Sequence, residues 1–122
     1  MIFGPAYKGI PLASAVGISY YEKTGKIIDL VFDRKEIKDH GEGGSLIGTL
    51  KSKKVLIIDD VLTAGTAIKN SLKIIKNEKA DLSAVVVALD REEKDESNNF
   101  YRDNLNKEGI KIFSIAKISE LN

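Results

Sequence analysis

The sequence predicts an α/β domain in which helices flank a mainly parallel sheet. Two stretches carry this prediction, because "KKVLIID" and "LSAVVVALD" are short, continuous apolar runs of the kind found in strands buried on both faces of a parallel sheet. A segment with helical spacing of apolar residues separates them, and parallel strands need such crossover connections. With 122 residues, 43% of them hydrophobic and 30% charged, the chain is long enough for one hydrophobic core.

The first helix is expected between a turn at Gly4-Pro5 and Gly25. The residues before the turn, Ile2 and Phe3, have strand character. Helical periodicity begins near Ile10, since the proline that follows is tolerated in a first helical turn. The apolar residues expected on the buried side of this helix are Leu12, Val16, Ile18 and Tyr20.

The rest of the chain alternates between strand and helix. The expected elements are strands over 26–32 and 53–59, a helix over 65–77, a strand over 82–90, a short helix near 99–107 and a strand over 110–118. The helix over 65–77 carries Ile68, Leu72 and Ile75 on one face. A charged, glycine-rich stretch after the first of these strands has no apolar period and predicts a loop.

Composition and charge narrow the class of protein. The net charge is +1, so bulk charge favours neither a nucleic-acid nor a membrane partner. The chain has no cysteine, which excludes disulfides and thiolate metal sites. No apolar run approaches the roughly 20 residues of a membrane span, and the N-terminus lacks the pattern of a secretory signal. We therefore expect a cytoplasmic protein.

The stretch "VLIIDDVLTAGTA" predicts a binding site for a phosphate group. In open parallel sheets, ligands bind beyond the carboxyl ends of the strands, where this stretch lies. Gly65 lets backbone N–H groups approach an anion closely, the hydroxyls of Thr63 and Thr66 add donors, and the following helix offers its positive N-terminal end. The pattern of a nucleotide-binding P-loop is absent.

Asp59 and Asp60 need a separate explanation, because two carboxylates do not attract a phosphate. They can accept hydrogen bonds from a pair of sugar hydroxyls, or help to hold a divalent cation through water. The alternative is that both acids merely end a strand and that, with Thr63, they cap the next helix. The apolar run before them and the T-A-G-T run after them favour a site for a ribose 5-phosphate.

This stretch resembles the phosphoribosyl pyrophosphate signature of the type I phosphoribosyltransferase family. The resemblance implies the parallel, Rossmann-type sheet of that family. It also implies that Asp59 and Asp60 hold the ribose hydroxyls, with Asp60 counted among the catalytic residues. The further substrate-binding residues that it implies are Val61, Leu62, Thr63, Ala64, Gly65, Thr66 and Ala67.

A second stretch, "DRKEIKDHGEGG", is similar to the catalytic loop of the orotate phosphoribosyltransferases in that family. A charge run of this kind is often only a solvated surface loop, but its glycines suit a loop that closes. Cations on such a loop can neutralise a departing pyrophosphate. The resemblance implies that Arg34, Lys35, Lys38 and His40 contact the pyrophosphate, with Lys38 stabilising the leaving charge and His40 assisting beside it.

Two shorter pieces fit the same family. "FGPAYKG" resembles its pyrophosphate-binding loop, which makes Tyr7 and Lys8 substrate contacts, although Lys8 could also be a surface lysine at a helix start. "LDR" resembles its orotate contact, so Arg91 would pair with the carboxylate of the base. The planar fork of arginine suits that task, although an ordinary loop arginine is the alternative.

The resemblance implies transfer of ribose 5-phosphate from phosphoribosyl pyrophosphate (PRPP) to orotate in pyrimidine biosynthesis. Mg²⁺ would be carried mainly by PRPP, and no dedicated protein metal site is expected. The basic loop would be shared across a homodimer. Two alternatives stay open: a non-catalytic PRPP-binding module of the same fold, and a phosphoribosyltransferase for another base.

The family carries a segment ahead of "FGPAYKG" that forms a hood over the base. Since Ile2 and Phe3 look like the tail of a strand, we expect residues 1–122 to be a single core domain without that N-terminal part. PRPP recognition is then largely encoded here and the orotate pocket only in part. An inactive fragment of the enzyme is therefore a further possibility.

Overall fold

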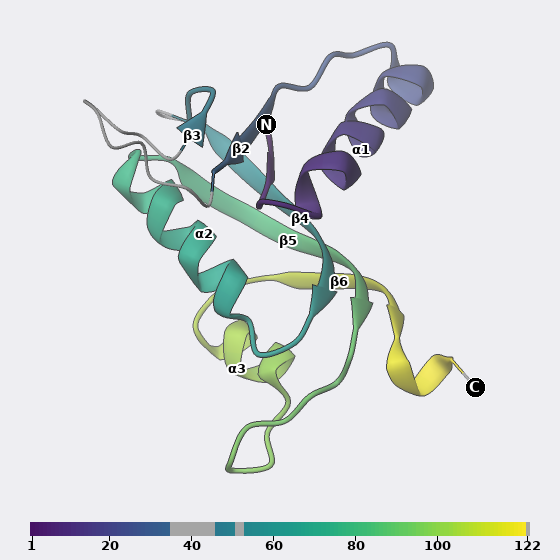
Figure 1. Cartoon of the computed structure of the whole chain (residues 1–122), viewed down its shortest axis with the longest axis vertical. Coiled ribbons are helices and arrows are strands. Elements are labelled where there is room, and N and C mark those ends of the chain that lie inside the picture. Colours follow the sequence, from purple (N-terminus) through teal and green to yellow (C-terminus); the bar gives the residue numbers. More distant parts are fainter. Residues whose placement is uncertain (35–45, 51–52, 122) are drawn as a thin grey trace.

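In the part of the chain that the structure describes, helices flank one six-stranded sheet. The computed structural model describes residues 1–34, 46–50 and 53–121. Within that part, the strands lie in the order β3-β2-β1-β4-β5-β6 (Figure 1). The elements are β1 (Ile2–Gly4), α1 (Gly9–Thr24), β2 (Leu30–Asp33), β3 (Leu46–Ile47), β4 (Lys54–Leu62), α2 (Thr66–Asn77), β5 (Asp81–Asp90), α3 (Tyr101–Lys107), β6 (Ile112–Lys117) and the 3-10 turn η1 (Ile118–Glu120).

The sheet is parallel except at one edge, which confirms the predicted fold class. β1 pairs with β2 and β4, β4 with β5, and β5 with β6, all in parallel. Only β3 runs antiparallel, beside β2. The carboxyl ends of β1, β2, β4 and β5 therefore meet at one edge of the sheet, where ligands bind in folds of this kind.

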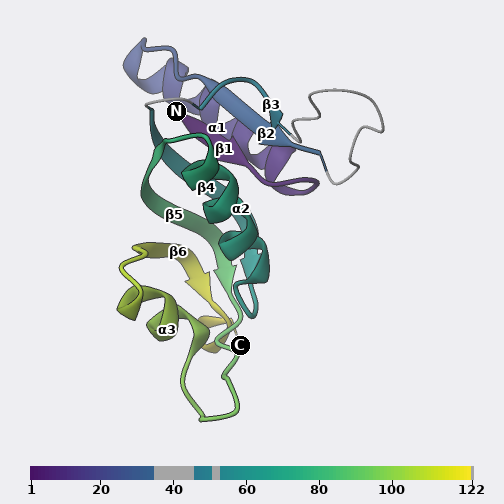
Figure 2. The ribbon, with the colours of Figure 1, turned by 90° about the vertical axis from the view of Figure 1, so that its left-hand side faces the viewer.

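Helices cover both faces of the sheet. Successive strand residues point to opposite faces, so Phe3 packs into one core with α2 and α3, while Ile2 packs into a second core with Ala13 of α1. Figure 1 shows α1 on one side of the sheet and α2 and α3 on the other. From the side, α1 and β1–β3 lie at one end of the molecule, and β6 and α3 at the other (Figure 2). Within the described part, no helix is long and apolar enough to cross a bilayer.

The predicted buried side of α1 is right only for Leu12, which is partly buried and packs against the core of Ile2 and Ala13. Val16, Ile18 and Tyr20 are 38%, 63% and 38% exposed, and the buried residues of this helix are Gly9 and Ala13. The helix approaches the sheet through small residues, because a Cβ on Gly4 would lie only 2.6 Å from the carbonyl oxygen of Gly9. Hydrophobic periodicity therefore misses this contact.

The largest departures from the predicted strand limits are in β2 and β4. β2 begins at Leu30 rather than Lys26, and Ile27 is 84% exposed. β4 continues through both acids to Leu62, because its ladder with β5 extends to the pair Leu62 and Asp90.

The predicted burial of both faces of β5 is also only partly right. Val85 and Val87 are fully buried, while Ser83 and Ala88 are exposed. In β6, Phe113 and Ile115 are exposed as well, so one face of this end of the sheet stays uncovered in the described part of the chain.

Candidate active site

The candidate site is a cleft at the carboxyl ends of β1, β2 and β4. Its first cavity has a volume of about 620 Å³, within the usual range for small-molecule sites. The residues after β4 that line it are Thr63, Gly65, Thr66, Ala67, Ile68, Asn70 and Ser71. Pro5, Ala6, Asp33 and Asp59 line it too, so three strand ends contribute to the cleft.

The start of α2 forms an anion cradle. Gly65 precedes the helix with φ of 83°, the left-handed conformation that glycine adopts without strain. Among the described residues, no side chain caps this helix end. The first backbone N–H groups of α2, from Thr66 onward, therefore remain available to an anion beside the positive end of the helix dipole. The alternative in which Thr63 serves as a helix cap does not hold.

Asp59 and Asp60 lie within β4 and are oriented by the backbone that follows them. Asp59 Oδ1 accepts the N–H of Asp60 at 2.9 Å, and Asp60 Oδ1 accepts the N–H of Val61 at 2.8 Å. The two acids do not end the strand, since β4 continues to Leu62. Each carboxylate is thus held in a fixed direction at the cleft, as binding of a sugar diol requires.

The loop after β1 brings a cation to these acids. Lys8 Nζ lies 3.6 Å from Asp60 Oδ2, although the lysine side chain is 82% exposed. Asp33, at the end of β2, fixes this loop, because its Oδ1 accepts the N–H of Ala6 at 2.6 Å. The Ala6–Tyr7 peptide bond is cis.

A second cavity of about 470 Å³ adjoins the first. Asp59, Val61 and Thr63 line both cavities, and the second adds Tyr7, Lys8, Asp60 and Arg91. A ligand with a phosphate at the α2 cradle and a sugar at the acids would therefore extend toward Arg91. That order suits a phosphoribosyl donor followed by an anionic base.

A tight turn after β5 sets the place of Arg91. Its N–H donates to the carbonyl of Leu62 at 3.2 Å. On the far side of the turn, Glu92 Oε1 accepts the N–H of Ser119 at 2.8 Å. Hydrogen bonding by the Ser119 side chain and backbone holds the pKa of Glu92 below its usual value, with smaller contributions from Arg102 and Lys117.

The structure brings together most of the described residues that the sequence singled out. Those that line the two cavities are Tyr7, Lys8, Asp59, Asp60, Val61, Leu62, Thr63, Gly65, Thr66, Ala67 and Arg91. Leu62 is only 1% exposed, so this residue contributes little accessible surface to the cavity. Arg34 and Ala64 are not among the described residues that line either cavity. Lys35, Lys38 and His40 lie outside the described residues.

Sequence reasoning missed Asp33 and Asn70 in the cavity wall. Asp33 had a usable signal, because it ends a strand whose carboxyl end lies at the same edge as Asp59. Asn70 had none, since a polar residue in the second turn of a helix is ordinarily solvated. Within the described part of the chain, no three His, Cys, Asp or Glu side chains gather as a metal site.

Comparison with known proteins gives the class of protein. Residues 1–117 match the phosphoribosyl transferase domain family, and the chain therefore belongs to that family. An orotate phosphoribosyltransferase of Thioalkalivibrio sulfidiphilus is 47% identical over 122 residues, which is 99% of this chain and 57% of the relative. One of Haemophilus influenzae is 50% identical over 94 residues, which is 77% of this chain and 44% of the relative.

A solved structure resembles this chain closely as well. The crystal structure of orotate phosphoribosyltransferase from Francisella tularensis superposes with a TM-score of 0.82 at 32% identity, covering 98% of this chain and 55% of that one. The chain thus spans about half the length of the relatives it matches.

Proposed function

We propose that this chain is the core of an enzyme that transfers ribose 5-phosphate from PRPP to orotate, giving orotidine 5′-monophosphate and pyrophosphate. The observation that carries the proposal is the shared wall of the two cavities, which joins a phosphate cradle, a pair of oriented acids and Arg91 in one cleft. The similarity to proteins named orotate phosphoribosyltransferase supports orotate as the base.

Each described residue has a part in the proposed reaction. The loop from Thr63 to Ala67 binds the 5-phosphate through N–H and hydroxyl donors. Asp59 and Asp60 accept hydrogen bonds from the ribose hydroxyls, and Lys8, with Tyr7, binds the pyrophosphate. The guanidinium of Arg91 pairs with the carboxylate of orotate, which fixes the base for attack on the ribose carbon.

Charge that develops on the leaving pyrophosphate needs neutralisation. We assign this to Lys38 with His40, and to Arg34 and Lys35 beside them. Loss of one such contact should cost about 10²–10³-fold in kcat, as with other donors aimed at developing negative charge. Water is excluded when the basic loop closes over the substrates.

Mg²⁺ belongs to the proposal as a partner of PRPP. Asp59 and Asp60 suit it, because carboxylate oxygens bind Mg²⁺ directly or accept hydrogen bonds from the waters bound to it. When bound, the ion supplies charge neutralisation at the substrate oxygens. We also propose a homodimer that shares the basic loop, a single core domain over residues 1–122, and a cytoplasmic location.

The test is the loss of orotate absorbance when the full-length natural protein meets orotate, PRPP and Mg²⁺. We expect turnover, which Lys38→Ala lowers about 10²–10³-fold while PRPP binding persists. PRPP binding without turnover of orotate or another base would instead indicate a sensor of PRPP. Turnover with a different base would refute orotate as the substrate, and undiminished turnover in Lys38→Ala would refute the role of the basic loop.

A further inference from the structure

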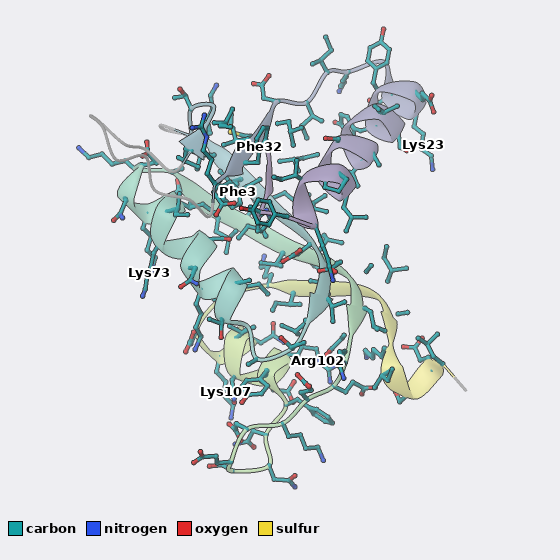
Figure 3. The ribbon with its side chains drawn as sticks, viewed as in Figure 1. Phe3, Lys23, Phe32, Lys73, Arg102 and Lys107 are labelled. Atoms are coloured by element: carbon teal, nitrogen blue, oxygen red, sulfur yellow. The ribbon has the colours of Figure 1, made fainter. Side chains whose placement is uncertain are left out.

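Behind the wall of the second cavity, Asp90 and Arg102 form a close ion pair. Arg102 Nη1 lies 2.6 Å from Asp90 Oδ2. Asp90 is 2% exposed, and the Arg102 side chain is 20% exposed. Asp90 ends β5 and Arg102 comes from α3, so the pair joins two elements, and Figure 3 shows Arg102 between them. Arg102 is not among the described residues that line either cavity.

The second oxygen of Asp90 holds the turn that carries Arg91. Asp90 Oδ1 accepts the N–H of Glu92 at 2.8 Å. Glu92 has φ of 53°, a left-handed conformation that a residue with a side chain rarely adopts without support. The N–H of Arg91 itself is held by the carbonyl of Leu62. Two hydrogen bonds therefore hold the backbone at Arg91. The Leu62 carbonyl accepts one of them, and the Asp90 carboxylate accepts the other.

Arg102 fixes that carboxylate in turn. A buried carboxylate needs a partner for its charge, and a hydrogen-bonded arginine also holds it in one rotamer. Without Arg102, the Asp90 carboxylate would turn toward water, and the support for Glu92 would weaken. Because Arg91 lies between Asp90 and Glu92, the backbone that places Arg91 at the second cavity would then be less firmly held.

We propose that Arg102 is a positioning residue for Arg91, and that it acts on the binding of the base rather than of PRPP. This inference rests on the proposed function, since it takes Arg91 as the contact to the carboxylate of orotate. A planar two-bond contact is sensitive to small errors in direction, so a residue that orients the arginine affects affinity without touching the ligand.

The test uses the full-length natural protein with Arg102→Gln, Arg91→Gln and the double variant. Lys107→Gln is the matched control, because Lys107 lies on the same helix, on the side away from β5 (Figure 3). We expect Arg102→Gln to raise the KM for orotate about tenfold, a coupling typical of residues in one network. The KM for PRPP should stay within about twofold, and Lys107→Gln should change neither value.

The double variant separates positioning from a general loss of structure. If Arg102 acts through Arg91, then adding Arg102→Gln to Arg91→Gln raises the KM for orotate little further. Equal rises in both KM values, or additive effects in the double variant, would overturn the inference. Should Arg102→Gln fail to fold, Arg102→Lys retains a cation beside Asp90 and is judged by the same criteria, with a smaller expected rise.

The outcomes also distinguish this inference from the proposed function. If Arg91→Gln leaves the KM for orotate unchanged, Arg91 is not the contact to the base. The part of the proposed function that assigns this contact and the positioning role of Arg102 are then both refuted. If Arg91→Gln raises that KM while folded Arg102→Gln or Arg102→Lys does not, the base contact stands and only the positioning role is refuted.

Discussion

Gly65 offers a direct test of the anion cradle, because two separate constraints act on it. Its φ of 83° is left-handed, and a Cβ there would lie 3.1 Å from Leu105 Cδ1. Gly25 is a matched control, since it is also left-handed, with φ of 71°, but a Cβ there would meet no atom within 4 Å. A change to alanine at Gly25 therefore tests the backbone cost alone, and the same change at Gly65 adds crowding.

The expected losses in the free energy of unfolding differ accordingly between Gly25→Ala and Gly65→Ala. A left-handed alanine costs about 1–2 kcal/mol, and reduced freedom of the unfolded chain returns about 0.4–1 kcal/mol. Gly25→Ala should thus lower the free energy of unfolding by roughly 1 kcal/mol or less. Crowding against the buried Leu105 should add about 1 kcal/mol or more at Gly65.

Urea unfolding of the two variants measures these free energies. Calorimetric titration with PRPP measures the affinity of the anion cradle at the start of α2. We expect Gly65→Ala to be the less stable variant and the only one with weakened PRPP binding. Equal stability of the two variants would show that Gly65 does not approach Leu105 closely. Unchanged PRPP binding in a folded Gly65→Ala would contradict the placement of the phosphate at the start of α2.

Three further outcomes are expected. Ile57→Ala should lower the free energy of unfolding in urea by about 2–5 kcal/mol, because Ile57 is fully buried in the core that β4 forms with α2 and α3. Lys8→Gln should change that free energy by less than about 1 kcal/mol, since its pair with Asp60 is exposed, yet it should raise the Kd for PRPP in calorimetry. The lowered pKa of Glu92 means that its contribution to stability is present above the ordinary value of 4.5 and is lost as the pH falls through the folded value. Unfolding measured across that acidic range should therefore depend less on pH in Glu92→Gln than in the natural protein.

The elements with strong patterns could be predicted from the sequence. The apolar face of α2 was correct for Ile68 and Ile75, because a single amphipathic face buried on one side leaves a clear period. The same reasoning fails for most of the buried side of α1. This helix packs through Gly9 and Ala13, and small residues carry little hydrophobic signal. The end of β4 was misplaced because backbone pairing with β5, rather than side-chain polarity, decides where the strand stops.

The residues of the candidate site are likewise predictable only in part from the sequence. Residues that are neighbours in sequence, such as Asp59 and Asp60, could be assigned to one place from their motif. Contacts between distant segments could not, and the hydrogen bond from the Ala6 N–H to Asp33 and the ion pair of Asp90 with Arg102 are both of that kind. A single acid at a strand end has many possible partners, and only the folded chain selects one.

In the proposed reaction, the cleft at the carboxyl edge of the sheet binds a ribose 5-phosphate donor through the two acids of β4. The most direct test of this binding is calorimetric titration of PRPP, and separately of inorganic phosphate, into the natural protein and into the Asp59→Asn, Asp60→Asn double variant. Asparagine keeps the Oδ1 acceptor for the backbone N–H bonds, so the fold should persist. We predict that PRPP binding weakens by about tenfold or more per acid, as for hydrogen bonds to charged groups, while phosphate binding stays nearly unchanged. Undiminished PRPP binding in the folded double variant would contradict the account.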